Sequence, residues 1–189
     1  MLFRSRVSKS GAKFDPEKTK WFNEHYLRTK SDEELGQALK PLASKHFGLQ
    51  EGDRRLEGHF LSVAAYLLKE RVQFESEFIE KGNYLFVAPD AYDEAVIAKR
   101  WKPELAEVFE SVVTAFRSID DFSEAATEAT FKEVAVAHQR KPGELLQLFR
   151  VLVSGQGGGV HLFGMVALLG KDEVVRRIEK ALTHLKTVA

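Results

Sequence analysis

The chain has 189 residues, of which 44% are hydrophobic and 30% charged, and its formal net charge is zero. This balance is typical of a globular protein, and no apolar run approaches the ~20 residues that a membrane-spanning helix needs. The absence of cysteine excludes disulfides, zinc knuckles and thiolate catalysis. The six histidines show no pairing at metal-ligand spacings, so we expect no metal site. The basic residues 1–13 lack the apolar core of a signal peptide, which predicts a cytoplasmic protein.

Charge is distributed unevenly along the chain. Residues 1–30 carry eight Lys or Arg against three Asp or Glu, giving +5, and residues 134–189 carry eight against four, giving +4. Residues 75–133 carry six against fourteen, giving −8. Such asymmetry is compatible with a nucleic-acid partner and equally with ordinary solvated helix faces, and charge alone leaves both open.

Helix signals begin near the N-terminus. An aspartate followed by a proline predicts a helix over 15–27, because the first side chain can cap and the second fits the first helical turn. Ser31 and Glu34 form a capping box, which predicts a second helix over 32–46. A turn over 48–53 follows.

Apolar residues then recur at helical spacing over 55–78, which predicts one long amphipathic helix. Gly82 is placed to cap a helix C-terminus, and residues 85–89 are expected to be an extended connector because a proline ends them. Further helices are predicted over 90–100, 103–117, 121–138, 142–153, 162–169 and 171–186, each from its start signals and periodicity.

These elements predict an all-α fold of two helical lobes. We expect residues 1–35 to be an N-terminal tail with a linker helix, residues 36–88 to be the first lobe and residues 89–189 the second. Trp21 and Trp101 are expected in the core, since large aromatic side chains dominate helical cores.

Four glycines in the six residues of 154–159 interrupt two strongly helical segments. The segment lacks the Gly-Lys-Ser/Thr ending of a phosphate-binding loop, and no strand precedes it. A flexible turn is one interpretation. The other is a base-binding pocket, in which Arg150 and the bare backbone hydrogen-bond to a base edge while Val160 and Leu162 contact its face.

Arg71 also has two interpretations: a surface ion pair with Glu75 one turn later, or a ligand-binding role. No catalytic residue can be proposed. The carboxylates lie outside apolar runs that would raise their pKa for acid–base work, and Ser8-Lys9-Ser10-Gly11 has no nucleotide-binding strand pattern near it.

Three blocks resemble the C-terminal half of bacterial glutamyl-tRNA synthetases, and together they extend from about Val7 to Leu182. The first is Lys9 to Asp15 with Lys18, Trp21, Asn23 and Tyr26-Leu27. The second is Leu68 to Arg71 with Gly82-Asn83-Tyr84-Leu85-Phe86. The third and most specific consists of Phe149-Arg150-Val151-Leu152-Val153-Ser154-Gly155, Leu162-Phe163 and Leu168-Leu169-Gly170-Lys171.

The resemblance implies an anticodon-binding region whose partner is glutamate tRNA, acting as a monomer. By this likeness Arg71 reads the third anticodon base, and the other bases meet Arg150, Gly159, Val160 and Leu162. The resemblance also implies that residues 1–35 are the tail of the stem-contact region with its linker helix. Within that tail, a basic surface for the tRNA backbone is implied at Lys9, Lys13, Lys18 and Lys20. Gly159 and Val160 stand where some relatives have Thr-Pro, which favours backbone over side-chain contacts there.

By the same likeness, the ATP- and magnesium-using domain that ligates glutamate to tRNA lies upstream of Val7, so Met1 is expected to mark a truncation. The chain alone then needs no cofactor and has no catalytic residue. Two alternatives are a stand-alone helical adaptor that binds a protein partner and a small complete enzyme.

Overall fold

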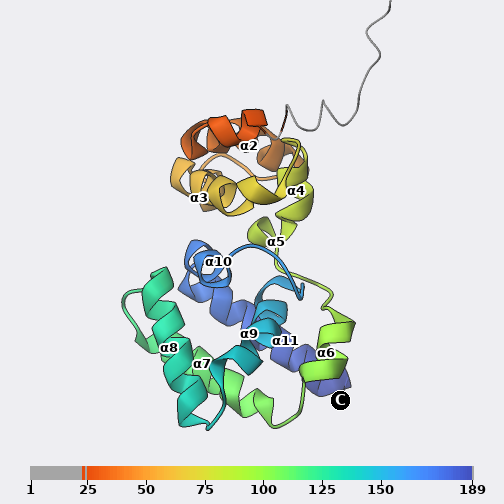
Figure 1. Ribbon diagram of the computed structural model, residues 1–189, viewed down its shortest axis with the longest axis vertical. Helices are drawn as coiled ribbons and strands as arrows, with labels where there is room; N and C mark the ends of the chain where they lie inside the picture. The colour runs from red at the N-terminus through yellow and green to blue at the C-terminus, as the bar shows by residue number, and fades with distance from the viewer. Residues whose placement is uncertain (1–22, 24, 189) are drawn as a thin grey trace, which may run out of the picture.

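The computed structural model describes residue 23 and residues 25–188, and every element within them is a helix (Figure 1). The predicted all-α fold is confirmed. In chain order the α-helices and 3₁₀ turns (η) are α2 (Asp32–Phe47), η1 (Arg54–Leu56), α3 (Gly58–Leu68), η2 (Lys69–Arg71), α4 (Glu77–Lys81), α5 (Asn83–Phe86), α6 (Glu94–Arg100), α7 (Leu105–Ser118), α8 (Glu124–Ala137), α9 (Pro142–Ser154), α10 (Leu162–Leu169) and α11 (Lys171–Val188).

The helices form two groups joined at α5 (Figure 1). Helices α2, α3 and α4 pack together at one end, and α6 to α11 form the larger group. The groups also touch directly, because α10 contacts both α3 and α5. Buried apolar side chains from both belong to one continuous core. The domain boundaries predicted at 35 and 88 remain predictions.

Several helix ends follow their sequence signals. The Glu34 amide donates to Ser31 Oγ over 3.1 Å, and the Ser31 amide donates to the Glu34 carboxylate over 2.8 Å, which confirms the capping box. Helix α9 begins at Pro142. It ends at Ser154 and is capped by Gly155, whose φ of 79° is left-handed and suits glycine. The predicted helix over 162–169 has the observed bounds.

The predicted single helix over 55–78 is wrong. It divides into η1, α3, η2 and α4. The backbone is extended at Glu57 (φ −68°, ψ 144°), between η1 and α3, and again at the buried Val72 (φ −118°, ψ 147°), after η2. Lys69, just before the second break, donates to the Lys30 carbonyl oxygen over 2.7 Å and pairs with Asp32 over 3.1 Å. Contacts with a distant segment therefore override local helical periodicity here.

Smaller differences occur elsewhere. Residues 83–86, partly predicted to be extended, form the short helix α5, and only the residues after it are non-helical before α6. Helices α6, α7 and α8 begin later than predicted, with Asp93 and Ser123 rather than Asp90 and Asp121 supplying the capping side chains of α6 and α8. Residues 23 and 25–29 are helical, whereas most of the helix predicted over 15–27, including Trp21, lies outside the described residues.

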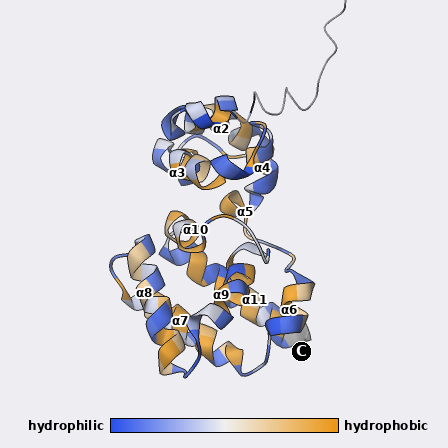
Figure 2. Cartoon of the chain, viewed as in Figure 1, coloured by the Kyte–Doolittle hydropathy of each residue, from blue (hydrophilic) through white to orange (hydrophobic). Residues whose placement is uncertain are grey.

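The core of the larger group is aromatic. Phe149 stacks on Phe131 with ring centroids 4.7 Å apart and also contacts Phe109, Phe116 and Phe163. Trp101 packs against this core, as predicted. Figure 2 shows hydrophobic and hydrophilic residues on the same helices, as amphipathic packing requires. Within the described part of the chain, no helix is long and apolar enough to cross a membrane.

Candidate functional site

The five residues predicted to read bases line one hollow of about 710 Å³, which we call the α9–α10 hollow. Arg71 lies on η2 and Arg150 on α9. Gly159 and Val160 come from the segment that joins α9 to α10, and Leu162 is the first residue of α10. The remaining lining residues are Glu128, Gly143, Leu146, Gln147, Gly157, His161 and Phe163. The fold thus brings together residues far apart in the sequence.

Arg150 is anchored at one nitrogen. Its Nη1 donates to the Val160 carbonyl oxygen over 2.7 Å, the single acceptor of this side chain among the described residues. Burial lowers the pKa of Arg150, and the positive charge of Arg71 lowers it further, while Tyr84 acts in the opposite direction. An arginine remains protonated under such shifts. The anchored guanidinium therefore keeps its charge and further N–H donors.

Arg71 is exposed, and within the described residues its side chain has no hydrogen-bond or ion-pair partner. The surface ion pair with Glu75 is absent, because Glu75 pairs with Lys30 over 3.3 Å instead. Arg71 also lines a neighbouring hollow of about 620 Å³ that shares Gly157 and Gly159 with the first. One unpaired guanidinium therefore borders two adjoining hollows.

Val160 and Leu162 line the hollow without offering free apolar side chains. They are only 1% and 6% exposed, and both belong to the core. These side chains were expected to contact the face of a base, but most of their apolar surface is buried in the protein core. Both backbone polar groups of Val160 are also used, since its amide donates to Tyr84 Oη over 3.3 Å. The role of these two residues in base reading remains a prediction.

The glycine segment is closely packed rather than a loose turn. Gly159 has a φ of 149°, and a Cβ there would lie 3.1 Å from Tyr84 Oη and 3.3 Å from Arg150 Nη1. A Cβ at Gly157 would lie 2.7 Å from an Asp93 carboxylate oxygen, which accepts from the Gly157 amide over 3.2 Å. Glycine at these two positions lets the backbone approach its neighbours closely.

Three residues that hold the site were not predicted. Tyr84 accepts from the Val160 amide, Asp93 accepts from the Gly157 amide while capping α6, and Gln147 reaches the Gly157 carbonyl oxygen over 3.5 Å. The Asp93-Glu94 pair is a helix-start signal that could have marked Asp93. Lys9, Lys13, Lys18 and Lys20 lie outside the described residues.

The sequence matches the family described as "Anticodon binding domain" over residues 27–182. The chain belongs to this family. It is 36% identical over 184 residues to a glutamate–tRNA ligase of Prosthecochloris aestuarii and 34% identical over 181 residues to that of Flavobacterium psychrophilum. These matches cover 95% and 96% of this chain but only 37% and 35% of the relatives.

The anticodon-binding domain also matches a solved structure, a glutamate tRNA ligase of Elizabethkingia meningosepticum in complex with its amino acid. The TM-score is 0.81 at 28% identity, covering 94% of this chain and 34% of the other. The chain therefore spans about a third of the length of these relatives. The predicted resemblance to the anticodon-binding region of glutamyl-tRNA synthetases is confirmed.

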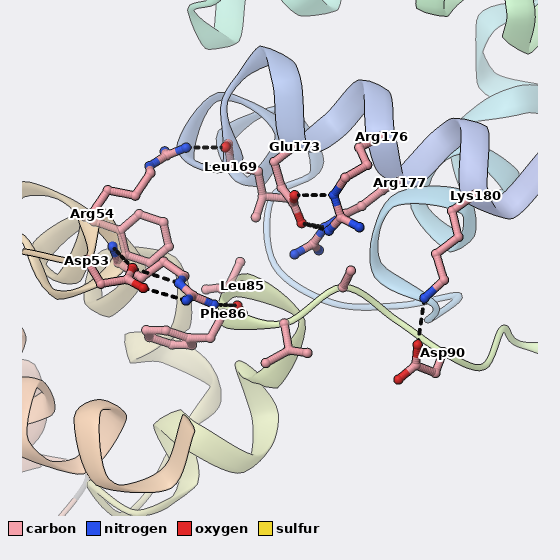
Figure 3. A pocket seen from close by; sticks show the side chains of 14 residues that line it. Asp53, Arg54, Leu85, Phe86, Asp90, Leu169, Glu173, Arg176, Arg177 and Lys180 are labelled. Carbon is pink, nitrogen blue, oxygen red and sulfur yellow. Dashed lines mark hydrogen bonds and ion pairs between the residues drawn. The ribbon is translucent and has the colours of Figure 1, made fainter. Parts of the chain in front are cut away.

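Another hollow of the anticodon-binding domain, of about 660 Å³, lies at the junction of the two helix groups (Figure 3). Its cations are already held by acceptors of the protein: Arg54 by the Leu168 and Leu169 carbonyls, Arg55 by Asp53 and the Phe86 carbonyl, Arg176 and Arg177 by Glu173, and Lys180 by Asp90. These contacts fix the junction. By contrast, the Arg71 side chain in the α9–α10 hollow has no such acceptor in the part of the chain that the structure describes.

Proposed function

We propose that this chain reads the anticodon of glutamate tRNA as part of a glutamate–tRNA ligase. The observation that carries the proposal is the α9–α10 hollow, where Arg71 and Arg150 meet a backbone segment that glycines leave bare. Protein–RNA recognition of defined sequence targets unstacked bases, whose edges hydrogen-bond and whose faces stack on planar groups, guanidinium included. The hollow offers both kinds of contact.

The charges of the hollow favour an anionic ligand such as RNA. Arg71 and Arg150 lie close enough for the charge of Arg71 to lower the pKa of Arg150. Glu128, an acidic residue of the lining, is paired with Lys132 over 2.7 Å. Two cations that repel one another are stabilised when a phosphate or the acceptor edge of a base lies between them.

The two adjoining hollows that share Arg71 suggest how more than one base is bound. One guanidinium between them can contact a base in either, which supports the predicted role of Arg71 at the third anticodon base and of Arg150 at the others. Phosphate contacts from the basic N-terminal residues would add affinity without sequence information. We propose Lys9, Lys13, Lys18 and Lys20 for that role.

The relatives described above are glutamate–tRNA ligases, which supports glutamate tRNA as the ligand and such a ligase as the parent enzyme. In this proposal the ligation of glutamate, with ATP and magnesium, belongs to the part of the relatives that this chain does not cover. No catalytic residue and no cofactor ligand is assigned here. We further propose that the domain acts as a monomer in the compartment where translation takes place.

The test is a titration of the 189-residue chain with glutamate tRNA and with the same tRNA carrying a substituted anticodon. We define the discrimination ratio as the affinity for the first divided by the affinity for the second. A ratio well above one is expected, with both affinities falling steeply as salt rises. Equal affinities would overturn the proposal, and no binding to either RNA would favour the protein-binding adaptor.

A further inference from the structure

Val160, whose carbonyl oxygen anchors Arg150, makes hydrogen bonds through both of its backbone polar groups. Val160 accepts from Arg150 through its carbonyl oxygen and donates to Tyr84 Oη through its amide. Tyr84 is 4% exposed, so its ring has little freedom to move the hydroxyl. The orientation of the Val160 peptide, and with it the position of the Arg150 guanidinium, therefore depends on a hydroxyl group supplied by α5.

Tyr84 is fixed in turn by Arg177 of α11. Arg177 Nη1 donates to the Tyr84 carbonyl oxygen over 2.6 Å and to the Val153 carbonyl oxygen over 3.1 Å. Val153 lies on α9, the helix that carries Arg150. One guanidinium thus binds the backbone of both elements that determine where Arg150 and its carbonyl acceptor lie.

The charge of Arg177 is compensated locally. The side chain is 1% exposed, and its Nε donates to Glu173 over 2.6 Å (Figure 3). Glu173 also accepts from Arg176, whose side chain is 57% exposed. A buried guanidinium with a carboxylate and two carbonyl acceptors has a defined orientation, because its donors form a rigid planar fork.

We infer that Tyr84 and Arg177 are positioning residues of the anticodon site: through Val160 and Val153 they hold Arg150 in the geometry that reads a base. This inference rests on the proposed function. Neither residue needs to touch RNA through its side chain. Their contribution lies in keeping the base-reading arrangement populated before tRNA arrives, since affinity falls with the populated fraction of the binding-competent state.

Tyr84→Phe is the decisive variant, because it removes one hydroxyl and keeps the ring. Tyr92→Phe is its matched control: Tyr92 is also buried, at 8% exposure, and its hydroxyl has no hydrogen-bond partner among the described residues. The measurement is the discrimination ratio of each variant, with the salt dependence of binding and urea unfolding measured alongside.

We expect Tyr84→Phe to lower the discrimination ratio about fivefold, the effect of one net hydrogen bond. Affinity for the anticodon-substituted tRNA and the salt slope should stay unchanged, because they report phosphate contacts. Tyr92→Phe should retain the wild-type ratio. Arg177→Lys, which keeps the charge but loses the planar fork, should also lower the ratio, whereas Arg176→Lys should not.

A discrimination ratio that Tyr84→Phe leaves unchanged would overturn the inference. If the ratio stays unchanged because the affinities for both tRNAs fall equally, the result would indicate a role of Tyr84 in stability alone. Failure of the proposed function is distinguishable, because it would appear as a ratio of one in the wild-type chain. A wild-type ratio above one that Tyr84→Phe and Arg177→Lys both retain would reject the positioning role only.

Discussion

Arg150 Nη1 donates to the Val160 carbonyl oxygen over 2.7 Å and so ties α9 to the segment that precedes α10. The bond fixes a charged side chain at the edge of the α9–α10 hollow and leaves its other N–H groups available for a ligand. Because the acceptor is a backbone group in a glycine-rich segment, the geometry depends on how tightly that segment packs.

Gly159→Ala tests that packing. The substitution forces a Cβ against Tyr84 and Arg150 at a φ that L-residues rarely adopt, so the free energy of unfolding should fall by about 1 to 3 kcal/mol. Gly158→Ala is the matched control, since a Cβ there would meet no atom within 4 Å. Urea unfolding of both variants measures the difference, and equal losses would show that the segment is loose.

Arg177→Met tests the buried junction. The change leaves the Tyr84 and Val153 carbonyl oxygens without this donor and removes one partner of Glu173, so we expect a loss of about 3 kcal/mol in unfolding free energy. Arg176→Met, which removes the exposed partner of the same carboxylate, should change it by less than about 1 kcal/mol. Comparable losses in urea unfolding would contradict the assigned role of Arg177.

The low pKa of Asp53 predicts that the free energy of unfolding depends on pH. Hydrogen bonds from Arg55 lower the pKa of Asp53 from 3.8 to about 2. Since the folded-state pKa is the lower one, the ionised carboxylate stabilises the fold above pH 3.8, and this contribution is lost as the pH falls towards about 2. The difference in unfolding free energy between wild type and Asp53→Asn should therefore shrink through this window. A difference that stays constant would argue against the Asp53–Arg55 interaction.

Local signals in the sequence predicted most of the fold. Ser31, Pro142, Gly155 and Gly170 mark helix ends through side-chain capping or backbone conformation, which act within a few residues. The break at Val72 has no such mark. It coincides with contacts between Lys69 and the segment near Lys30, and sequence periodicity contains no information about a partner that distant.

Only part of the candidate site could be predicted, again because contacts between residues distant in the sequence leave no local signal. Arg150 was identified by its place beside the glycine segment and by family resemblance, and Arg71 was assigned its role through the resemblance. Tyr84, Asp93 and Arg177, by contrast, act through hydrogen bonds to backbone groups. Those bonds join residues 76, 64 and 93 positions apart, respectively. A backbone hydrogen-bond partner leaves no residue-type signature in the sequence. Apart from the helix-start signal at Asp93, only the folded structure therefore reveals these supporting residues.

We predict that Lys18 contacts phosphates and that Arg150 contacts bases, and the salt dependence of tRNA affinity tests this division. Lys18→Ala should reduce the slope of log affinity against log salt by about 1 while leaving the discrimination ratio intact. Arg150→Ala should lower the ratio instead, with less effect on the slope. Titrations of both variants at several salt concentrations supply the values, and identical behaviour of the two would contradict the division.

The most direct test of base capture is chemical probing of the Watson–Crick edges of the anticodon in glutamate tRNA, with and without the chain. Protection of the anticodon bases by the wild-type chain is expected, and Arg150→Ala should restore their reactivity while protection of the phosphates elsewhere persists. Anticodon bases that remain equally reactive in the wild-type complex would contradict the central claim that the α9–α10 hollow binds them.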